Sequence, residues 1–170
     1  ESKIVIYICE HNANGAIGLI INCPTEYRLD FIFEQLNIIS TEKLIGKQKI
    51  LFGGPVQKDR GFVLHSPLKG FKENLGLNSS ICISTSKEIL SKIACGEGPN
   101  DALITLGYAG WSANQLEEEV ANNLWLTLEV DEKILFDIPY NERWQCAVDS
   151  LGLDISKLVI MPGANSSTLN

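Results

Sequence analysis

The side chains best suited to chemistry are two histidines and a cysteine near the start of the chain. His11 and His65 each lie at or just past the end of an expected strand, and Cys9 precedes His11 by two residues. The period of two along a strand would place Cys9 and His11 on one face. Such a pair can form a nucleophile with its base, or half of a metal site.

A complete metal site is not predicted. It needs about three or four ligands, and the sequence has no HxxxH, HExxH or CxxC spacing that would supply the rest. We therefore expect hydrogen-bonded structural roles for His11 and His65, with no catalytic residue, no metal and no cofactor. Glu117-Glu118-Glu119 is expected to form a solvated helix face.

A glycine pair offers a second kind of site. Gly53-Gly54-Pro55 follows a strand expected at 49–52, and bare amides there could cradle a phosphate. The segment matches neither GxGxxG nor GxxxxGK[ST], and Pro55 has no amide hydrogen to donate. A tight strand exit that uses the φ range of glycine is the simpler interpretation.

A third segment, Gly107-Tyr108-Ala109-Gly110-Trp111-Ser112, is interpreted as a loop between a central strand and a helix capped by Ser112 and Gln115. Open α/β sheets often bind ligands at such a place. Tyr108 and Trp111 offer flat amphipathic surface, although Trp111 could equally fill the core beneath the loop.

We expect these strand-end segments to converge on one concave surface for a ligand or partner. The candidate residues of this surface are His11, Asn22, Pro24, Gly53, Gly54, Pro55, His65, Gly107, Tyr108, Gly110 and Trp111.

Composition limits the class of protein. The chain has 170 residues, of which 45% are hydrophobic and 21% charged, values typical of one globular domain. With 14 basic and 21 acidic residues the net charge is −7, which disfavours direct nucleic-acid binding. No apolar run is long enough for a membrane span. Five scattered cysteines without a CxxC indicate reduced thiols in the cytoplasm.

Periodicity and turn residues predict an α+β domain with a mixed, mostly antiparallel sheet and helices around it. One domain is expected over 1–162, followed by a flexible tail at 163–170. Strands are expected at 4–9, 16–21, 49–52, 61–65, 81–83, 102–106 and 124–130, and helices at 28–37, from a capping box at 85–88 to about 95, after 112, and at 141–151.

The motifs as a set resemble one family. Cys9-Glu10-His11-Asn12, Asn22-Cys23-Pro24, Gly53-Gly54-Pro55 and the segment from Gly107 to Ser112 occur in the order and spacing of the AlgH/YqgE-like family of small bacterial proteins. The resemblance continues through Leu124-Trp125-Leu126 and Arg143-Trp144 and covers nearly the whole chain. It implies a bifurcated sheet partly curled into a small barrel, and a further strand before residue 1.

Most members of that family are uncharacterised or loosely labelled transcriptional regulators. We expect a non-catalytic binding or regulatory module with a protein partner or a small ligand. One alternative is an enzyme on a small phosphorylated or nucleotide-like ligand, using the Gly53-Gly54 amides and one histidine. Another is a transcriptional regulator that acts through a protein partner, since the charge disfavours DNA.

Overall fold

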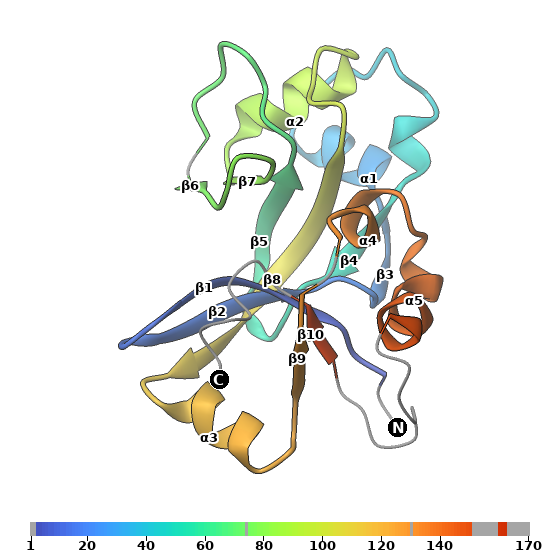
Figure 1. The fold of residues 1–170 in the computed structure, drawn as a ribbon. Coiled ribbons are helices and arrows are strands. Elements are labelled where there is room, and N and C mark those ends of the chain that lie inside the picture. The colour runs from blue at the N-terminus through green and yellow to red at the C-terminus, as the bar shows by residue number, and fades with distance from the viewer. Residues whose placement is uncertain (1–2, 74, 130, 151–159, 163–170) are drawn as a thin grey trace.

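A computed structural model describes residues 3–73, 75–129, 131–150 and 160–162, and it confirms the predicted α+β class. An eight-stranded, mostly antiparallel sheet follows the order β1-β2-β8-β5-β7-β6, with β4 on β8 and β3 on β4 (Figure 1). Its strands are β1 Ile6–Asn12, β2 Gly15–Ile20, β3 Pro24–Arg28, β4 Lys49–Phe52, β5 Val56–His65, β6 Leu75–Gly76, β7 Cys82–Ser84 and β8 Ala102–Ser112. A parallel pair, β9 Leu126–Leu128 and β10 Ile160–Pro162, forms a second sheet.

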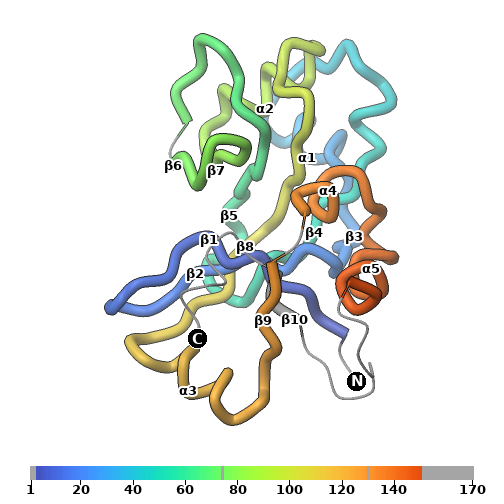
Figure 2. The backbone as a smooth tube through the Cα atoms, in the orientation of Figure 1, coloured from blue at the N-terminus to red at the C-terminus, as the bar shows by residue number. Residues whose placement is uncertain are grey.

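Helices pack around this sheet on several sides. They are α1 Leu29–Gln35, α2 Lys87–Ala94, α3 Gln115–Ala121, α4 Lys133–Phe136 and α5 Arg143–Asp149, with short 3₁₀ turns η1 Ile45–Lys47 and η2 Tyr140–Glu142. The backbone tube shows α1 and α2 at one end, α3 at the other, and α4 with α5 at one side (Figure 2). Each group covers its own apolar cluster, so the core has three parts.

The long strand β8 joins the two halves of the sheet. Its first half pairs with β5 along one edge and, through Thr105 and Leu106, in parallel with β4 along the other. Its second half pairs with β2, from Ala109 to Ser112. The sheet therefore divides along β8, which accounts for the bifurcated, curled shape that the resemblance implied.

The segment from Gly107 to Ser112 is not the loop that the sequence suggested. It is the second half of β8, because the ladder with β2 provides it with backbone hydrogen-bond partners. Likewise, β5 begins at Val56, earlier than the strand expected at 61–65. The expected capping box at 85–88 also differs, since Ser86 is the N-cap residue of α2 and makes no side-chain cap hydrogen bond.

A β-bulge separates Cys9 from His11. The register of β1 against β2 shifts between Ile8 and Glu10, so the alternation of side chains is broken there. Cys9 consequently faces the cluster that contains Tyr7, whereas His11 pairs with Ala16 on the opposite face. The expectation that Cys9 and His11 share a face is wrong, because that expectation assumed an unbroken period of two.

His65 is fully buried and both of its ring nitrogens are engaged. Nδ1 lies 2.8 Å from the carbonyl oxygen of Ser66, which can only accept, so Nδ1 carries the proton. Nε2 forms a hydrogen bond with the hydroxyl of Ser84 at 2.8 Å. The His65 ring therefore links β5 to β7.

We predict that His65 and Ser84 are coupled in stability. Either His65→Ala or Ser84→Ala leaves a buried polar group without its partner, which costs about 1–3 kcal/mol of unfolding free energy. Because the double variant removes both groups, its loss should be smaller than the sum of the single losses. Urea unfolding of the four proteins measures this, and strictly additive losses would contradict the assignment.

Candidate functional site

Two of the glycine segments meet as backbone against backbone. The Gly53 amide donates to the Leu106 carbonyl at 2.7 Å, so it is not free to cradle a phosphate. A Cβ on Gly53 would overlap the Gly107 carbonyl, and one on Gly54 would overlap the backbone of Tyr108. Gly107 also has φ +76, which favours glycine. These residues come together, but the contact between their backbones leaves no cleft between them.

The other candidate residues are placed separately. The Asn22 side chain accepts from the Val5 amide at 2.9 Å and donates to the Lys3 carbonyl at 2.6 Å, so it fixes the start of the chain beside β2. Pro24 begins β3, and Pro55 is exposed in the connection to β5. Gly110 pairs with Ile17 on an exposed part of β8.

His11 and Trp111 lie over α3, where they meet two carboxylates. His11 Nε2 lies 3.0 Å from an oxygen of Glu117. Glu119 Oε1 accepts from the indole nitrogens of Trp111 at 3.0 Å and Trp125 at 2.8 Å. The expectation of a solvated acidic face therefore fails for these glutamates. The pairing of His11 with Glu117 gives no signal in sequence, because the two residues are far apart in the chain. Trp111 and Trp125 are near Glu119 in sequence, but no local motif marks them as its donors.

The acidity of these groups reflects their surroundings. Partial burial alone would raise the pKa of Glu119, but hydrogen bonds from Trp125, Trp111 and Gln115 outweigh it and lower the pKa. The pKa of Glu117 is also lowered, first by its backbone amide and then by His11. Burial strongly raises the pKa of the Cys9 thiol, so Cys9 is not a poised nucleophile.

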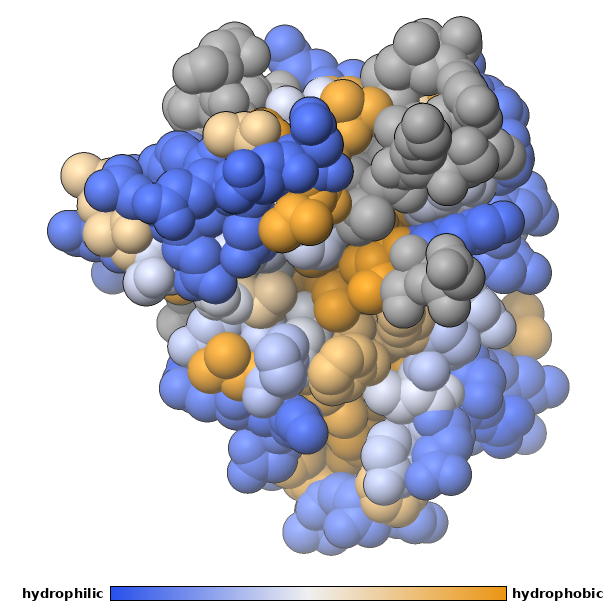
Figure 3. Space-filling model, turned by 90° about the horizontal axis from the view of Figure 1, so that it is seen from below, coloured by the Kyte–Doolittle hydropathy of each residue, from blue (hydrophilic) through white to orange (hydrophobic). Residues whose placement is uncertain are grey.

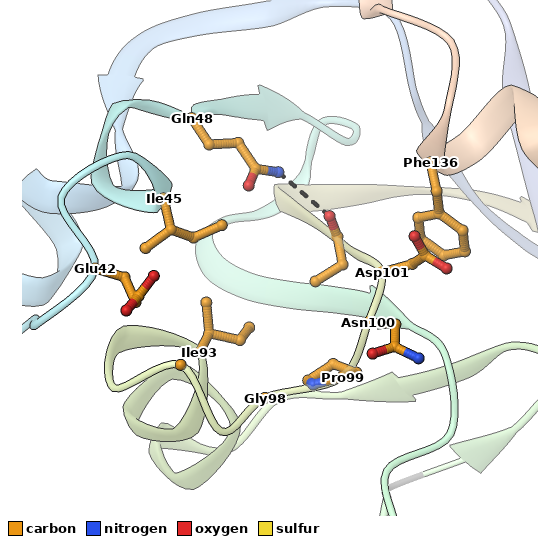
Figure 4. A pocket seen from close by; sticks show the side chains of 11 residues that line it. Glu42, Ile45, Gln48, Ile93, Gly98, Pro99, Asn100, Asp101 and Phe136 are labelled. Carbon is orange, nitrogen blue, oxygen red and sulfur yellow. Dashed lines mark hydrogen bonds between the residues drawn. The ribbon is translucent and has the colours of Figure 1, made fainter.

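Phe136 lines three surface depressions, which lie near the Ala102 end of β8. The depression in Figure 4 has a volume of about 380 Å³, with Glu42 and Ile93 on one side and Asp101 and Phe136 on the other. A second, of about 370 Å³, is also rich in carboxylates. A third, of about 430 Å³, is lined instead by Lys47, Lys49 and Arg143.

Apolar side chains are exposed along residues 27–44. The described part of the chain has nine exposed large hydrophobic residues, of which five lie in this segment: Tyr27, Phe31, Leu36, Ile39 and Leu44. The rings of Tyr27 and Phe31 stack with centroids 5.0 Å apart. We call this segment the α1 surface.

The face of the molecule seen from below carries another apolar band between hydrophilic areas (Figure 3).

An apolar groove adjoins the α1 surface. It has a volume of about 350 Å³ and runs between α1 and α2 over β8, lined by Ile32, Leu36, Leu90 and Ile104 among others. Leu36 belongs to both features, since it is 36% exposed and also lines the groove. The groove therefore adds a concave site, which can receive a side chain, to the exposed apolar residues of the α1 surface.

Comparison with known proteins assigns the family. The model of the AlgH-like family matches residues 2–156. The chain belongs to the AlgH-like family. A UPF0301 protein of Thioalkalivibrio sulfidiphilus is 47% identical over 152 residues, which cover 89% of this chain and 81% of that protein. One of Legionella pneumophila is 46% identical over 92% of this chain and 83% of its own length.

A solved AlgH-like structure agrees with the fold. The solution structure of the AlgH protein from Pseudomonas aeruginosa is 45% identical, with a TM-score of 0.75 over 89% of this chain and 80% of that one. In the described part of this AlgH-like chain, no helix has the length and apolar character to cross a bilayer. Nor do the described residues include a group of three or more metal-ligating side chains.

We predict that protonation of Glu119 loosens α3. Since its folded pKa lies below the ordinary value of about 4.3, the stabilisation is complete above that pH and is lost as the pH falls through the folded value. In an NMR titration from about pH 6 to about pH 3, the indole Nε1–H resonances of Trp111 and Trp125 should shift together.

Neighbouring glutamates supply the control for this titration. Glu119→Gln should abolish the concerted indole shift, whereas Glu118→Gln, at an exposed position, should leave it unchanged. An unchanged titration in Glu119→Gln would show that Glu119 does not hold α3 through the two indoles.

Proposed function

We propose that this AlgH-like chain is a non-catalytic binding module that acts in the cytoplasm through a protein partner docked on the α1 surface. The single observation that carries the proposal is the concentration of exposed large hydrophobic residues on one short segment. A gathering of exposed large apolar side chains is typical of interaction sites. The five free cysteines fit a reducing compartment.

The state of the polar residues supports binding rather than catalysis. His65 is buried with both ring nitrogens bonded, Cys9 is buried with a raised pKa, and His11 is held by Glu117. A general base or nucleophile must reach its substrate. The two histidines instead connect one element of the fold to another, and Cys9 lies within the core.

The shape of the α1 surface supports a protein partner. Ile39 is 86% exposed and Leu44 is 82% exposed, so they project into solvent as anchors would. The groove beside Leu36 gives the partner a concave feature in which to place an apolar side chain of its own. With a net charge of −7, a protein is favoured over DNA as the partner.

Site-specific photo-crosslinking in cells tests the proposal. A benzoylphenylalanine at Phe31 should give a discrete protein adduct, and the same probe at Leu75, which is 45% exposed on β6, should not. Ile39→Asp should abolish the Phe31 adduct and weaken binding of the identified partner by more than about 2 kcal/mol, the scale of an interface anchor.

Leu75→Asp is the matched control and should leave the Phe31 adduct intact. Circular dichroism and urea unfolding should show that Ile39→Asp keeps the fold, because Ile39 contributes little buried area. Adducts of equal yield at Phe31 and Leu75, or a Phe31 adduct that survives Ile39→Asp, would overturn the proposal.

A further inference from the structure

The third depression beside Phe136 collects positive charge in an acidic protein. Its lining includes Lys47, Lys49 and Arg143 against one carboxylate, Asp137, which gives the lining a net charge of +2. The whole chain has a net charge of −7. We call this depression the basic pocket, because it opposes the overall charge and so attracts an anion locally.

Arg143 is a buried cation without a carboxylate partner. Its residue is only 5% exposed, and no described acidic side chain forms an ion pair with it. Its guanidinium donates instead to backbone carbonyls, from Nε to Ile138 at 2.9 Å, from Nη2 to Leu135 at 2.8 Å and from Nη1 to Ile21. Buried charges are ordinarily paired, because the loss of hydration costs several kcal/mol.

The carbonyl contacts hold Arg143 in place without neutralising it. A guanidinium has five N–H groups, and the three bonds leave two without an acceptor among the described residues. Burial also lowers the pKa of Arg143 to about 10, because the loss of hydration disfavours the charged form. At neutral pH Arg143 remains protonated.

Two lysines come from a different part of the chain. Lys47 ends η1 and Lys49 begins β4, and both line the pocket together with Arg143 of α5. Lys49 Nζ lies 3.4 Å from the Thr25 carbonyl, which positions it without supplying a negative charge. The two remaining N–H groups of Arg143 and two ammonium groups are a suitable set of donors for phosphate oxygens.

We propose that the basic pocket binds the phosphate group of a small organic phosphate through Arg143, Lys47 and Lys49. A phosphate monoester carries about −1.5 to −2 charge at pH 7, which complements the +2 of the lining. Phe136 and Tyr140 supply apolar walls for the organic part of the ligand. This site is independent of the α1 surface and makes no use of the Gly53 amide.

An NMR titration of the whole protein with three probes tests the assignment. Phenyl phosphate should bind saturably and shift the amide resonances of Lys47, Lys49 and Arg143. Inorganic phosphate should bind at the same residues more weakly, and phenol should not bind. Sodium chloride holds the ionic strength constant. Lys47→Ala and Lys49→Ala should each weaken phenyl phosphate about tenfold, which corresponds to about 1.4 kcal/mol.

Lys58→Ala is the matched control, since Lys58 is an exposed lysine on β5 outside the pocket lining. It should leave the affinity unchanged. Arg143→Lys keeps the charge but loses the fork, and it should weaken phenyl phosphate without loss of the folded spectrum. The lysine variants keep the test valid if the fold does not tolerate a change at Arg143.

Three results would overturn the proposal. One is the absence of saturation by phenyl phosphate up to about 10 mM, beyond the range of a millimolar site. Another is equal weakening by Lys58→Ala, which would mean non-specific attraction. The third is equal affinity for inorganic phosphate and phenyl phosphate, which would exclude an organic ligand held by Phe136 and Tyr140.

Discussion

The close contact of Gly53 and Gly54 with Gly107 and Tyr108 is the constraint on which the rest of the structure depends. At this point the chain leaving β4 lies so close to β8 that a Cβ on Gly53 or Gly54 would overlap the backbone of β8. The Gly53 amide and carbonyl bond to Leu106 and Ile20, so one residue links β4, β8 and β2. The contact therefore holds the two halves of the divided sheet together.

This constraint removes the glycine segments from the candidate binding surfaces. Because the glycine segments are occupied by contacts with each other, they leave no open backbone for a ligand. The histidines and Cys9 are likewise engaged within the fold. Among the described residues, exposed apolar side chains gather along residues 27–44 and one depression is lined by three cations, and the two binding proposals rest on these features.

Much of the fold follows from local pattern, and much of the site does not. The hairpin, the amphipathic helices and the central strand at 102–106 were predictable, since each depends on nearby residues. The continuation of β8 through Gly110 was not, because only pairing with β2 makes that glycine-rich segment a strand. A bulge of one residue in β1 reversed the expected side of His11 relative to Cys9. Arg143 bonds to backbone carbonyls, which no sequence pattern marks, and no local motif identifies the indoles six and eight residues from Glu119 as its partners.

The most direct test of this account is the free energy of unfolding of three glycine variants, measured in urea. Gly54→Ala and Gly107→Ala should each cost more than about 3 kcal/mol, because backbone overlap adds to the strain of positive φ. Gly110→Ala should change stability by less than about 1 kcal/mol, since its Cβ meets only the Tyr108 ring at 3.6 Å. If Gly54→Ala and Gly107→Ala are instead as stable as the parent protein, the glycine contact does not hold the sheet together and the account is wrong.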